Sequence, residues 1–264
     1  MSNKGKKIYL IIIWVITLIV IIFGIYRFIG SGSWDIFNFF GTAKYIEKTE
    51  DLTADITELD VDVHSANVII EEGDAPSIYY SFPEKSEVNI HNENGKVSFA
   101  ENNNKNNIIL FGSGKKKEVR ITLPRDRQLV RINTKTHSGN LEINNVKCDD
   151  VITNQDSGNL RVNNIVAKNL KSEADSGNIN VNSSIENVNV EVDSGNVEVN
   201  GNIEKLDVKA DSGNIKLAGN LHVITAKADS GNITIDSNRP ESEMVLKLDV
   251  DTGKITVNGN RYKD

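Results

Sequence analysis

Apolar and polar residues alternate along most of this chain, in short stretches separated by one recurring tetrapeptide. The alternation begins at Leu59, Val61 and Val63. The tetrapeptide Asp-Ser-Gly-Asn stands at 156–159, 175–178, 193–196, 211–214 and 229–232, and near copies stand at 64–67, 137–140 and 251–254. From residue 137, successive copies begin 19, 19, 18, 18, 18 and 22 residues apart. A fixed period near twenty residues indicates a stacked repeat architecture.

Aligning the copies on their first residue places apolar side chains at constant positions. Positions four and six after that residue hold Leu141 and Ile143, Leu160 and Val162, Ile179 and Val181, Val197 and Val199, Ile215 and Leu217, Ile233 and Ile235, and Ile255 and Val257. Positions five, three and one before it are mostly apolar as well, for example Leu206, Val208 and Ala210. Alternation with period two predicts strands that bury one face. Three short strands per repeat would form one coil of a solenoid.

The predicted fold class is therefore all-β: a single-stranded β-helix or β-solenoid, right-handed, of about 7–8 coils of 18–19 residues, with one N-terminal transmembrane helix. Equivalent positions of neighbouring coils would stack at about the 4.8 Å spacing of paired strands, which gives seven coils a length on the order of 30–35 Å. Each coil buries its inward side chains against its neighbours, so the array stabilises itself cooperatively.

Residues 74–117 interrupt the repeat, because they separate the copy at His64 from the copy at His137. Strand-like alternation occurs at 77–82, 87–91, 97–100 and 108–111, and Glu93-Asn94-Gly95 predicts a hairpin turn. We expect these hairpins to flank the first coil and to cover it. The longer last interval predicts an inserted loop at 238–243, where Pro240 disfavours a strand.

An apolar segment near the N-terminus predicts a membrane span. Ile8 to Tyr26 is apolar except for Thr17 and Gly24, and its 19 residues would extend about 28 Å as a helix. Lys4, Lys6 and Lys7 precede it, so the positive-inside rule keeps the N-terminus in the cytoplasm and places the rest outside. The alternative is a cleaved signal peptide, but the apolar stretch is long for one and no Ala-x-Ala site follows it.

These features divide the chain into three parts. Residues 1–30 form the cytoplasmic tip and signal anchor, residues 31–55 form a juxtamembrane linker, and residues 56–264 form the extracytoplasmic solenoid domain, with the excursion at 74–117. The linker carries the aromatic residues Trp34, Phe37, Phe39 and Phe40, which would lie at headgroup level or dock under the first coil. The predicted location is the cell membrane, crossed once.

Composition narrows the chemistry. The 264 residues carry a formal charge of −7, which argues against a nucleic-acid partner. The single cysteine, Cys148, excludes an internal disulfide and a multi-cysteine metal site. Its position suggests a coil turn, so a membrane-impermeant maleimide is expected to label it. The sequence contains no Walker loop, zinc pattern or Ser/His/Asp arrangement.

The recurring tetrapeptide allows three interpretations. Asp-Ser-Gly is the active-site triplet of aspartic proteases, but those enzymes oppose two aspartates in one cleft, whereas here the triplet forms a column. We therefore predict no catalytic and no cofactor-binding residue. The tetrapeptide is predicted to be a turn in which glycine adopts positive φ and asparagine side chains stack in a ladder. The predicted turn residues are Gly139, Gly158, Gly177, Gly195, Gly213, Gly231 and Gly253, with Asn140, Asn159, Asn178, Asn196, Asn214 and Asn232.

The third interpretation is a cation column. Aspartates about 5 Å apart repel by roughly 0.8 kcal/mol per neighbour even at the dielectric constant of water, so solvent, backbone donors or a cation must offset the repulsion. The residues concerned are Asp156, Asp175, Asp193, Asp211, Asp229 and Asp251. The nine-residue calcium pattern of β-rolls is absent. The turn interpretation is preferred over a cation site.

Three features together resemble a known family: the segment from Leu59 to Ile70, the strand from Val119 to Pro124, and the serial Asp-Ser-Gly-Asn turns. They are similar to the bacterial "putative adhesin" β-strand-repeat family and, with the anchor, to its LiaG-like membrane-anchored members in Gram-positive bacteria. The resemblance implies a β-helical domain outside the membrane, associated with cell-envelope stress responses. It supplies no catalytic residues.

These observations predict a non-enzymatic, membrane-tethered, extracytoplasmic interaction module in the cell-envelope stress response or in surface interaction. Its expected partners are the membrane, envelope proteins and cationic peptides. The alternative is a self-assembling structural or adhesive surface protein in which exposed end coils pair, which would make it a homo-oligomer. A third hypothesis, an envelope hydrolase, requires one repeat's aspartate to differ from the others in its effect on activity.

Overall fold

The structure is a computed structural model that describes residues 13–20, 22, 44–53, 55–102 and 116–262. Residues 13–20 and 22 are helical and their side chains are exposed. Within the described part of the chain, no helix is both long enough and apolar enough to cross a membrane. The predicted span from Ile8 to Tyr26 lies in part outside the described residues, and so do most of the linker and the predicted strand at 108–111.

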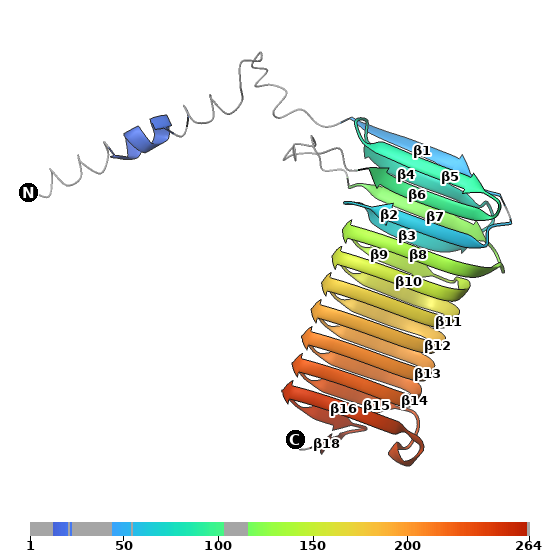
Figure 1. The fold of residues 1–264 in the computed structure, drawn as a ribbon, viewed down its shortest axis with the longest axis vertical. Coiled ribbons are helices and arrows are strands. Elements are labelled where there is room, and N and C mark those ends of the chain that lie inside the picture. Colours follow the sequence, from blue (N-terminus) through green and yellow to red (C-terminus); the bar gives the residue numbers. More distant parts are fainter. Residues whose placement is uncertain (1–12, 21, 23–43, 54, 103–115, 263–264) are drawn as a thin grey trace, which may run out of the picture. The chain divides into compact units, whose positions relative to one another are not determined.

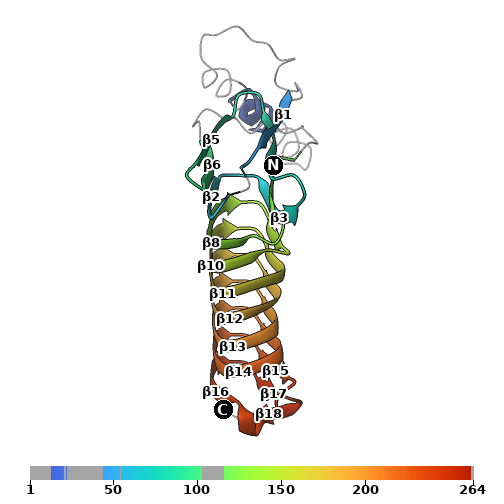
Figure 2. The same cartoon turned by 90° about the vertical axis from the view of Figure 1, so that its right-hand side faces the viewer.

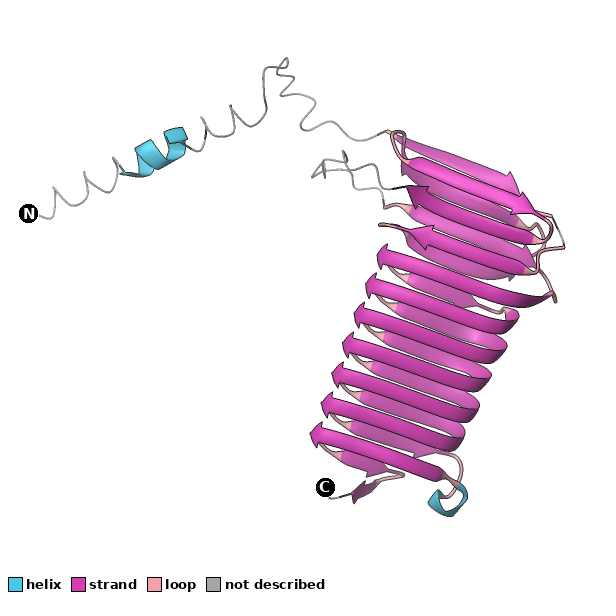
Figure 3. Ribbon diagram, in the orientation of Figure 1, coloured by secondary structure: helices cyan, strands magenta, loops and turns pink. Residues whose placement is uncertain are grey.

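The domain that follows is built from strands (Figures 1 and 3). The N-terminal strands are β1 (Tyr45–Asp51), β2 (Glu58–Val63), β3 (Asn67–Gly73), β4 (Ser77–Pro83), β5 (Glu87–Glu93), β6 (Lys96–Asn102) and β7 (Glu118–Pro124). The repeat region holds β8 (Gln128–Ser138), β9 (Leu141–Asn144), β10 (Lys147–Ser157), β11 (Leu160–Ser176), β12 (Ile179–Ser194), β13 (Val197–Ser212) and β14 (Ile215–Ser230). The C-terminal elements are β15 (Ile233–Ser237), the 3-10 helix η2 (Glu241–Glu243), β16 (Val245–Thr252), β17 (Ile255–Val257) and β18 (Asn260–Tyr262).

The repeats stack in parallel as a β-solenoid of about seven turns, which confirms the predicted all-β fold. Each turn contributes to two faces, which Figure 2 shows edge on. Face 1 contains β2, β8, β10, the C-terminal parts of β11 to β14, and β16. Face 2 contains β3, β9, the N-terminal parts of β11 to β14, β15 and β17. The side chains between the two faces form the core.

The predicted three short strands per coil are replaced by one long strand that bends. In β13 the parallel pairing with β14 runs from Val197 to Ser212 and skips only Glu204 and Asp211. The bend falls where Glu204 and Lys205 are both exposed, which shifts the inward alternation by one residue. Because each coil bends at the same place as its neighbour, the hydrogen-bond ladder continues around the bend. In β11 to β14 only the Ser-Gly-Asn turn ends the strand, whereas β9 and β10 are separate strands, as are β15 and β16.

The N-terminal end shows two departures from the sequence prediction. The excursion does more than cover the first coil, because β6 pairs in parallel with β2 and β7 pairs in parallel with β3, so that they add a further layer to the stack. Antiparallel strands then cover that layer, with β5 on β6, β4 on β7 and β1 on β4. Strand β1 lies within the predicted linker. Most of its side chains are exposed, so no alternating pattern reveals it in the sequence.

At the C-terminal end, the inserted loop at 238–243 contains η2, and Met244 beside it is buried. Strand β18 pairs antiparallel with β17 on face 2. Strand β16 pairs with β14 and with no other described strand, so its outer edge is unpaired within the described residues.

The core changes character along the stack. Its inward column one residue before each motif holds Val63 in the first coil, Thr136 and Gln155 in the next two, and then Ala174, Val192, Ala210 and Ala228. Gln155 is 3% exposed, and neither its amide nitrogen nor its amide oxygen has a hydrogen-bond partner among the described residues. A buried polar group without a partner costs about 1–3 kcal/mol. Gln155 is therefore a weak point of the interior.

We expect Gln155→Met to raise the free energy of unfolding by about 1 kcal/mol, because methionine keeps the volume and removes the unpaired amide. Thr153→Val is the matched control: Thr153 donates to Ser172 Oγ at 2.8 Å inside the same coils, so its loss should lower stability by about 1 kcal/mol. Chemical denaturation of the purified protein measures both. Equal destabilisation by the two substitutions would show that the amide of Gln155 is satisfied.

Candidate functional site

The corner between the two faces is a column of glycines that touch one another. Gly213 has φ of 148°, and a Cβ atom built on it would lie 1.8 Å from the carbonyl oxygen of Gly195 in the preceding coil. Gly177 and Gly195 meet the coil before them in the same way, at 1.7 and 1.8 Å. Glycine is therefore required here by close backbone approach as well as by its φ. In the first coil Ala66 occupies the equivalent position, and Gly139 packs on its carbonyl group.

The asparagine after each corner glycine belongs to a side-chain ladder. The backbone N–H and the Nδ2 amide of Asn159 both donate to Oδ1 of Asn140, each at 3.1 Å. The same pair of bonds recurs at Asn178, Asn196, Asn214 and Asn232, and Oδ1 of Asn67 accepts from the N–H of Asn140. Each amide oxygen thus satisfies donors of the turn in the next coil. The ladder is structural, and it occupies the amides that a ligand would otherwise use.

Two aspartates of the corner column have lysine neighbours. Lys209 lies 3.1 Å from Asp211, and Lys227 lies 3.1 Å from Asp229. The hydrogen bond to Asp229 raises the pKa of Lys227, and hydrogen bonds to Glu191 and then Asp211 raise the pKa of Lys209. Across the described residues, no group of three or more His, Cys, Asp and Glu side chains is placed to hold a metal ion. At Asp211 and Asp229, lysine side chains thus provide counter-charge.

Two histidines replace the corner aspartate in the coils nearest the N-terminal cap. The rings of His64 and His137 have centroids 4.3 Å apart and planes inclined by 59°. His137 Nδ1 lies 2.5 Å from Asp156 Oδ2, in the next coil. On the other side, Oε2 of the buried Glu101 accepts the backbone N–H groups of His64 and Ser65. This corner is where titratable groups from the cap and from the stack meet.

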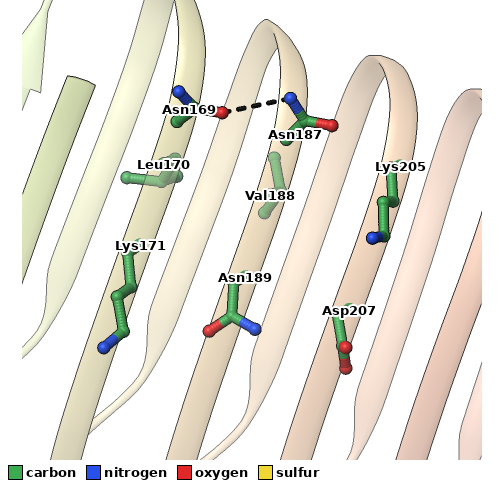
Figure 4. Close-up of a pocket in the computed structure, with 8 residues that line it drawn as sticks. All are labelled: Asn169, Leu170, Lys171, Asn187, Val188, Asn189, Lys205 and Asp207. Atoms are coloured by element: carbon green, nitrogen blue, oxygen red, sulfur yellow. Dashed lines mark hydrogen bonds between the residues drawn. The ribbon is translucent and has the colours of Figure 1, made fainter.

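Face 1 carries a shallow groove of about 260 Å³ across three consecutive coils, shown in Figure 4. It is lined by Asn169, Leu170, Lys171, Asn187, Val188, Asn189, Lys205 and Asp207. Asn187 donates to Asn169 Oδ1 at 3.0 Å, and Asn169 donates in turn to Asp150. That ladder ends at Lys205, which occupies the next position of the column.

The side chains that line the groove include hydrogen-bond donors and acceptors, but they do not include a nucleophile paired with a base. Lys171 forms an ion pair with Glu173 at 2.7 Å, and that hydrogen bond raises the pKa of the ammonium group. Asn189 and Lys205 are exposed, and Asn189, Lys205 and Asp207 have no hydrogen-bond or ion-pair partner among the described residues. No candidate base lies beside a nucleophile here. The arrangement is suited to binding a polar or charged chain.

Cys148 does not lie at an exposed turn, which its position in the sequence suggests. It is 1% exposed within β10 and packs in the core, where Sγ–H donates to the carbonyl oxygen of Asp150. Burial raises the pKa of its thiol to about 11. Cys148 is the second residue of β10, whose alternating burial places this side chain on the inward face. The expectation that maleimide reaches it is therefore wrong.

A maleimide experiment should give the opposite result. The native thiol is expected to stay unlabelled until the protein unfolds, because it is buried and almost entirely protonated at neutral pH. Glu186→Cys in a Cys148→Ser background places a thiol at an exposed site of β12 and should label readily. Counting adducts by mass spectrometry with and without denaturant decides the point. Fast labelling of native Cys148 would contradict its burial.

The fold and its corners define a class of protein: a single-chain β-solenoid whose repeated motif is architectural. The chain belongs to the Toastrack DUF4097 family, whose model matches residues 56–264. The family assignment confirms the resemblance inferred from the repeats. A LiaG-like identity within it stays a prediction.

Comparison with solved structures supports the same fold. A "putative adhesin" from Bacteroides fragilis is 17% identical, with a TM-score of 0.58 over 82% of this chain and 97% of that chain. Another so described, from Parabacteroides merdae, is 15% identical, with a TM-score of 0.44 over 82% and 97%. Identities this low establish the fold of the first and nothing about ligands. A comparison with curated proteins found no match.

Proposed function

We propose that this protein is a non-enzymatic interaction module, tethered to the membrane by residues 8–26, whose solenoid binds a polar or charged envelope component outside the cell. We place its role in the cell-envelope stress response or in surface interaction. The Toastrack fold and the name of its Bacteroides fragilis relative make a surface role plausible for this chain.

Two features of the N-terminus support the tether. The segment from Ile8 to Tyr26 is apolar and preceded by three lysines. Its described part is helical, and Trp14, Ile16 and Leu18 expose 72%, 55% and 58% of their surface. Such an apolar surface is stable in lipid and costly in water. Alkaline carbonate extraction of membranes tests the tether, since release of the protein into the supernatant would contradict it.

The groove on face 1 is the observation that carries the binding proposal. Its uncommitted side chains, Asn189, Lys205 and Asp207, lie on consecutive strands held in register by the parallel ladder. A rigid scaffold lets such groups bind without losing much conformational entropy. Lysines beside amides suit the phosphate or hydroxyl groups of an envelope polymer. A cationic peptide would instead follow the corner, where Asp175 and Asp193 lack an ion-pair partner among the described residues.

The test is a titration of the full-length protein, in detergent, against isolated envelope polymers and a cationic peptide. We expect saturable binding to one of them, and an at least tenfold weaker affinity for a polymer in Lys171→Ala/Lys205→Ala. The matched control, Arg161→Ala/Lys216→Ala, removes the same charge from exposed sites of face 2 and should bind like the native protein. Absence of saturable binding to every ligand would overturn the proposal.

One observation favours self-assembly as the second candidate function. The outer edge of β16 is unpaired among the described residues, and Val245 in that strand is 59% exposed. Unprotected edges promote pairing between chains. Sedimentation at increasing concentration distinguishes the two functions: association that Val245→Lys abolishes would support assembly, and a monomer throughout would reject it.

A further inference from the structure

The histidine corner between cap and stack has a geometry that a turn does not require. Elsewhere in the column the first motif residue is aspartate, and only the copies at His64 and His137 carry imidazole. These two coils are neighbours, since β2 pairs with β8 up to Val63 and Thr136. Figure 1 shows β2, β8 and β10 in succession along the stack. The two rings are therefore adjacent, with centroids 4.3 Å apart.

Asp156 fixes the orientation of one ring. His137 Nδ1 lies 2.5 Å from Asp156 Oδ2, and an ionised carboxylate can only accept a hydrogen bond. The neutral ring therefore carries its proton on Nδ1 and presents the lone pair of Nε2. The side chain of His137 is 29% exposed, so the ring is partly open to solvent. A carboxylate behind a histidine in this way is the usual support of a metal-bound imidazole.

The spacing of the rings suits two adjacent positions around one metal ion. Imidazole nitrogens bind such ions at about 2.0–2.1 Å, which puts each ring centroid roughly 3 Å from the ion. Centroids 4.3 Å apart then subtend close to a right angle at the ion. That angle is found between neighbouring ligands in tetragonal Cu²⁺ and Ni²⁺ sites, where water can fill the remaining positions.

We propose that His64 and His137 bind a divalent transition-metal ion of the Cu²⁺ or Ni²⁺ type, with Asp156 as the positioning residue. The charges around the two rings permit a cation to bind, because the ammonium group of Lys117 is already paired with Glu101 and Asp156 contributes a negative charge. The proposed site has only two protein ligands. It is compatible with the finding that no group of three or more His, Cys, Asp and Glu side chains is placed to hold a metal ion among the described residues. The ion would join the first coil, through the turn that follows β2, to the next coil, through β8.

The experiment uses the full-length protein without a polyhistidine tag, in detergent at neutral pH. Cu²⁺ titration with electron paramagnetic resonance should give one equivalent whose spectrum shows coupling to imidazole nitrogen. The double substitution His64→Asp/His137→Asp installs the residue that the other coils carry, so it should fold, and it should lose this signal. Circular dichroism confirms folding, and His64→Asn/His137→Asn provides a second variant without added charge.

Two further variants separate binding from structure. Asp156→Ala should weaken Cu²⁺ binding by about 10- to 100-fold, because the ring loses its orienting acceptor. His222→Asn is the matched control: His222 also lies 2.5 Å from a carboxylate, that of Glu204, but no second imidazole accompanies it among the described contacts. It should leave Cu²⁺ affinity unchanged. Equal Cu²⁺ binding by the native protein and the double aspartate variant would overturn the site, whatever the outcome of the envelope-binding experiment.

Discussion

Gly213→Ala is expected to lower the free energy of unfolding by about 4 kcal/mol, among the largest single-residue effects in this protein. Part of the loss is the positive φ of 148°, which costs a β-substituted residue about 1–2 kcal/mol. The rest is steric, because the new Cβ would lie 1.8 Å from the carbonyl oxygen of Gly195 and 2.6 Å from its carbonyl carbon. To relieve that overlap the two coils must separate, which weakens the backbone bonds from Gly195 N–H to Ser212 and from Val197 N–H to Asn214, 2.9 and 3.0 Å long.

Gly259→Ala separates the two contributions. Gly259 also has positive φ, 83°, but nothing lies within 4 Å of the position that its new Cβ would take, so only the conformational cost of about 1 kcal/mol applies. Denaturant titrations followed by circular dichroism measure both variants. Because coils stabilise one another through their interfaces, Gly213→Ala should also broaden the transition. Similar losses for the two alanines would show that backbone strain alone, and not the contact between coils, explains the glycine column.

The repeats could be predicted because the residue pattern that specifies each coil is local in the sequence and recurs in every copy. Val197 and Val199, or Ile215 and Leu217, each lie at a fixed distance from a Gly, and seven such registers leave few alternatives to stacking. The strand number per coil was harder to predict. Sequence marks the bend only by the two exposed residues Glu204 and Lys205, and whether a hydrogen-bond ladder breaks there depends on the neighbouring coil.

The cap and the candidate sites depend on contacts between distant residues. β6 continues the solenoid because it pairs with β2, some forty residues earlier, and no periodic motif marks that pairing. Cys148 is buried because it faces inward at the start of β10, which its position relative to the motif did not reveal. The groove needs side chains from three coils, and the histidine corner needs the register of β2 against β8. In each case the sequence contains the residues, but only the pairing shows that they meet.

Glu101→Ala is expected to lower the free energy of unfolding of the cap by about 3 kcal/mol. Glu101 is 8% exposed, and its Oε2 accepts the N–H groups of His64 and Ser65 at 2.9 and 3.0 Å. Its Oε1 accepts from Lys117 Nζ at 2.7 Å, and that ammonium group also lies over the Phe82 ring. Alanine would leave two turn donors and a largely buried cation without their acceptor, and breaking a buried pair in this way costs about 3–5 kcal/mol.

The expected loss of stability lies at the lower end of this range, because Lys117 Nζ keeps its hydrogen bond to Ser65 Oγ and the lysine is partly exposed. Glu101→Gln keeps the shape and one acceptor, so it should cost about half as much. Glu84→Ala is the control, because its pair with Lys44 at 3.2 Å is exposed and should contribute less than about 0.5 kcal/mol.

Limited proteolysis shows which part of the protein loses stability. Cleavage should begin between β1 and β7, since the carboxylate closes the turn that joins the cap to the repeats; cleavage that begins in the repeats would show that Glu101 does not hold the cap in place.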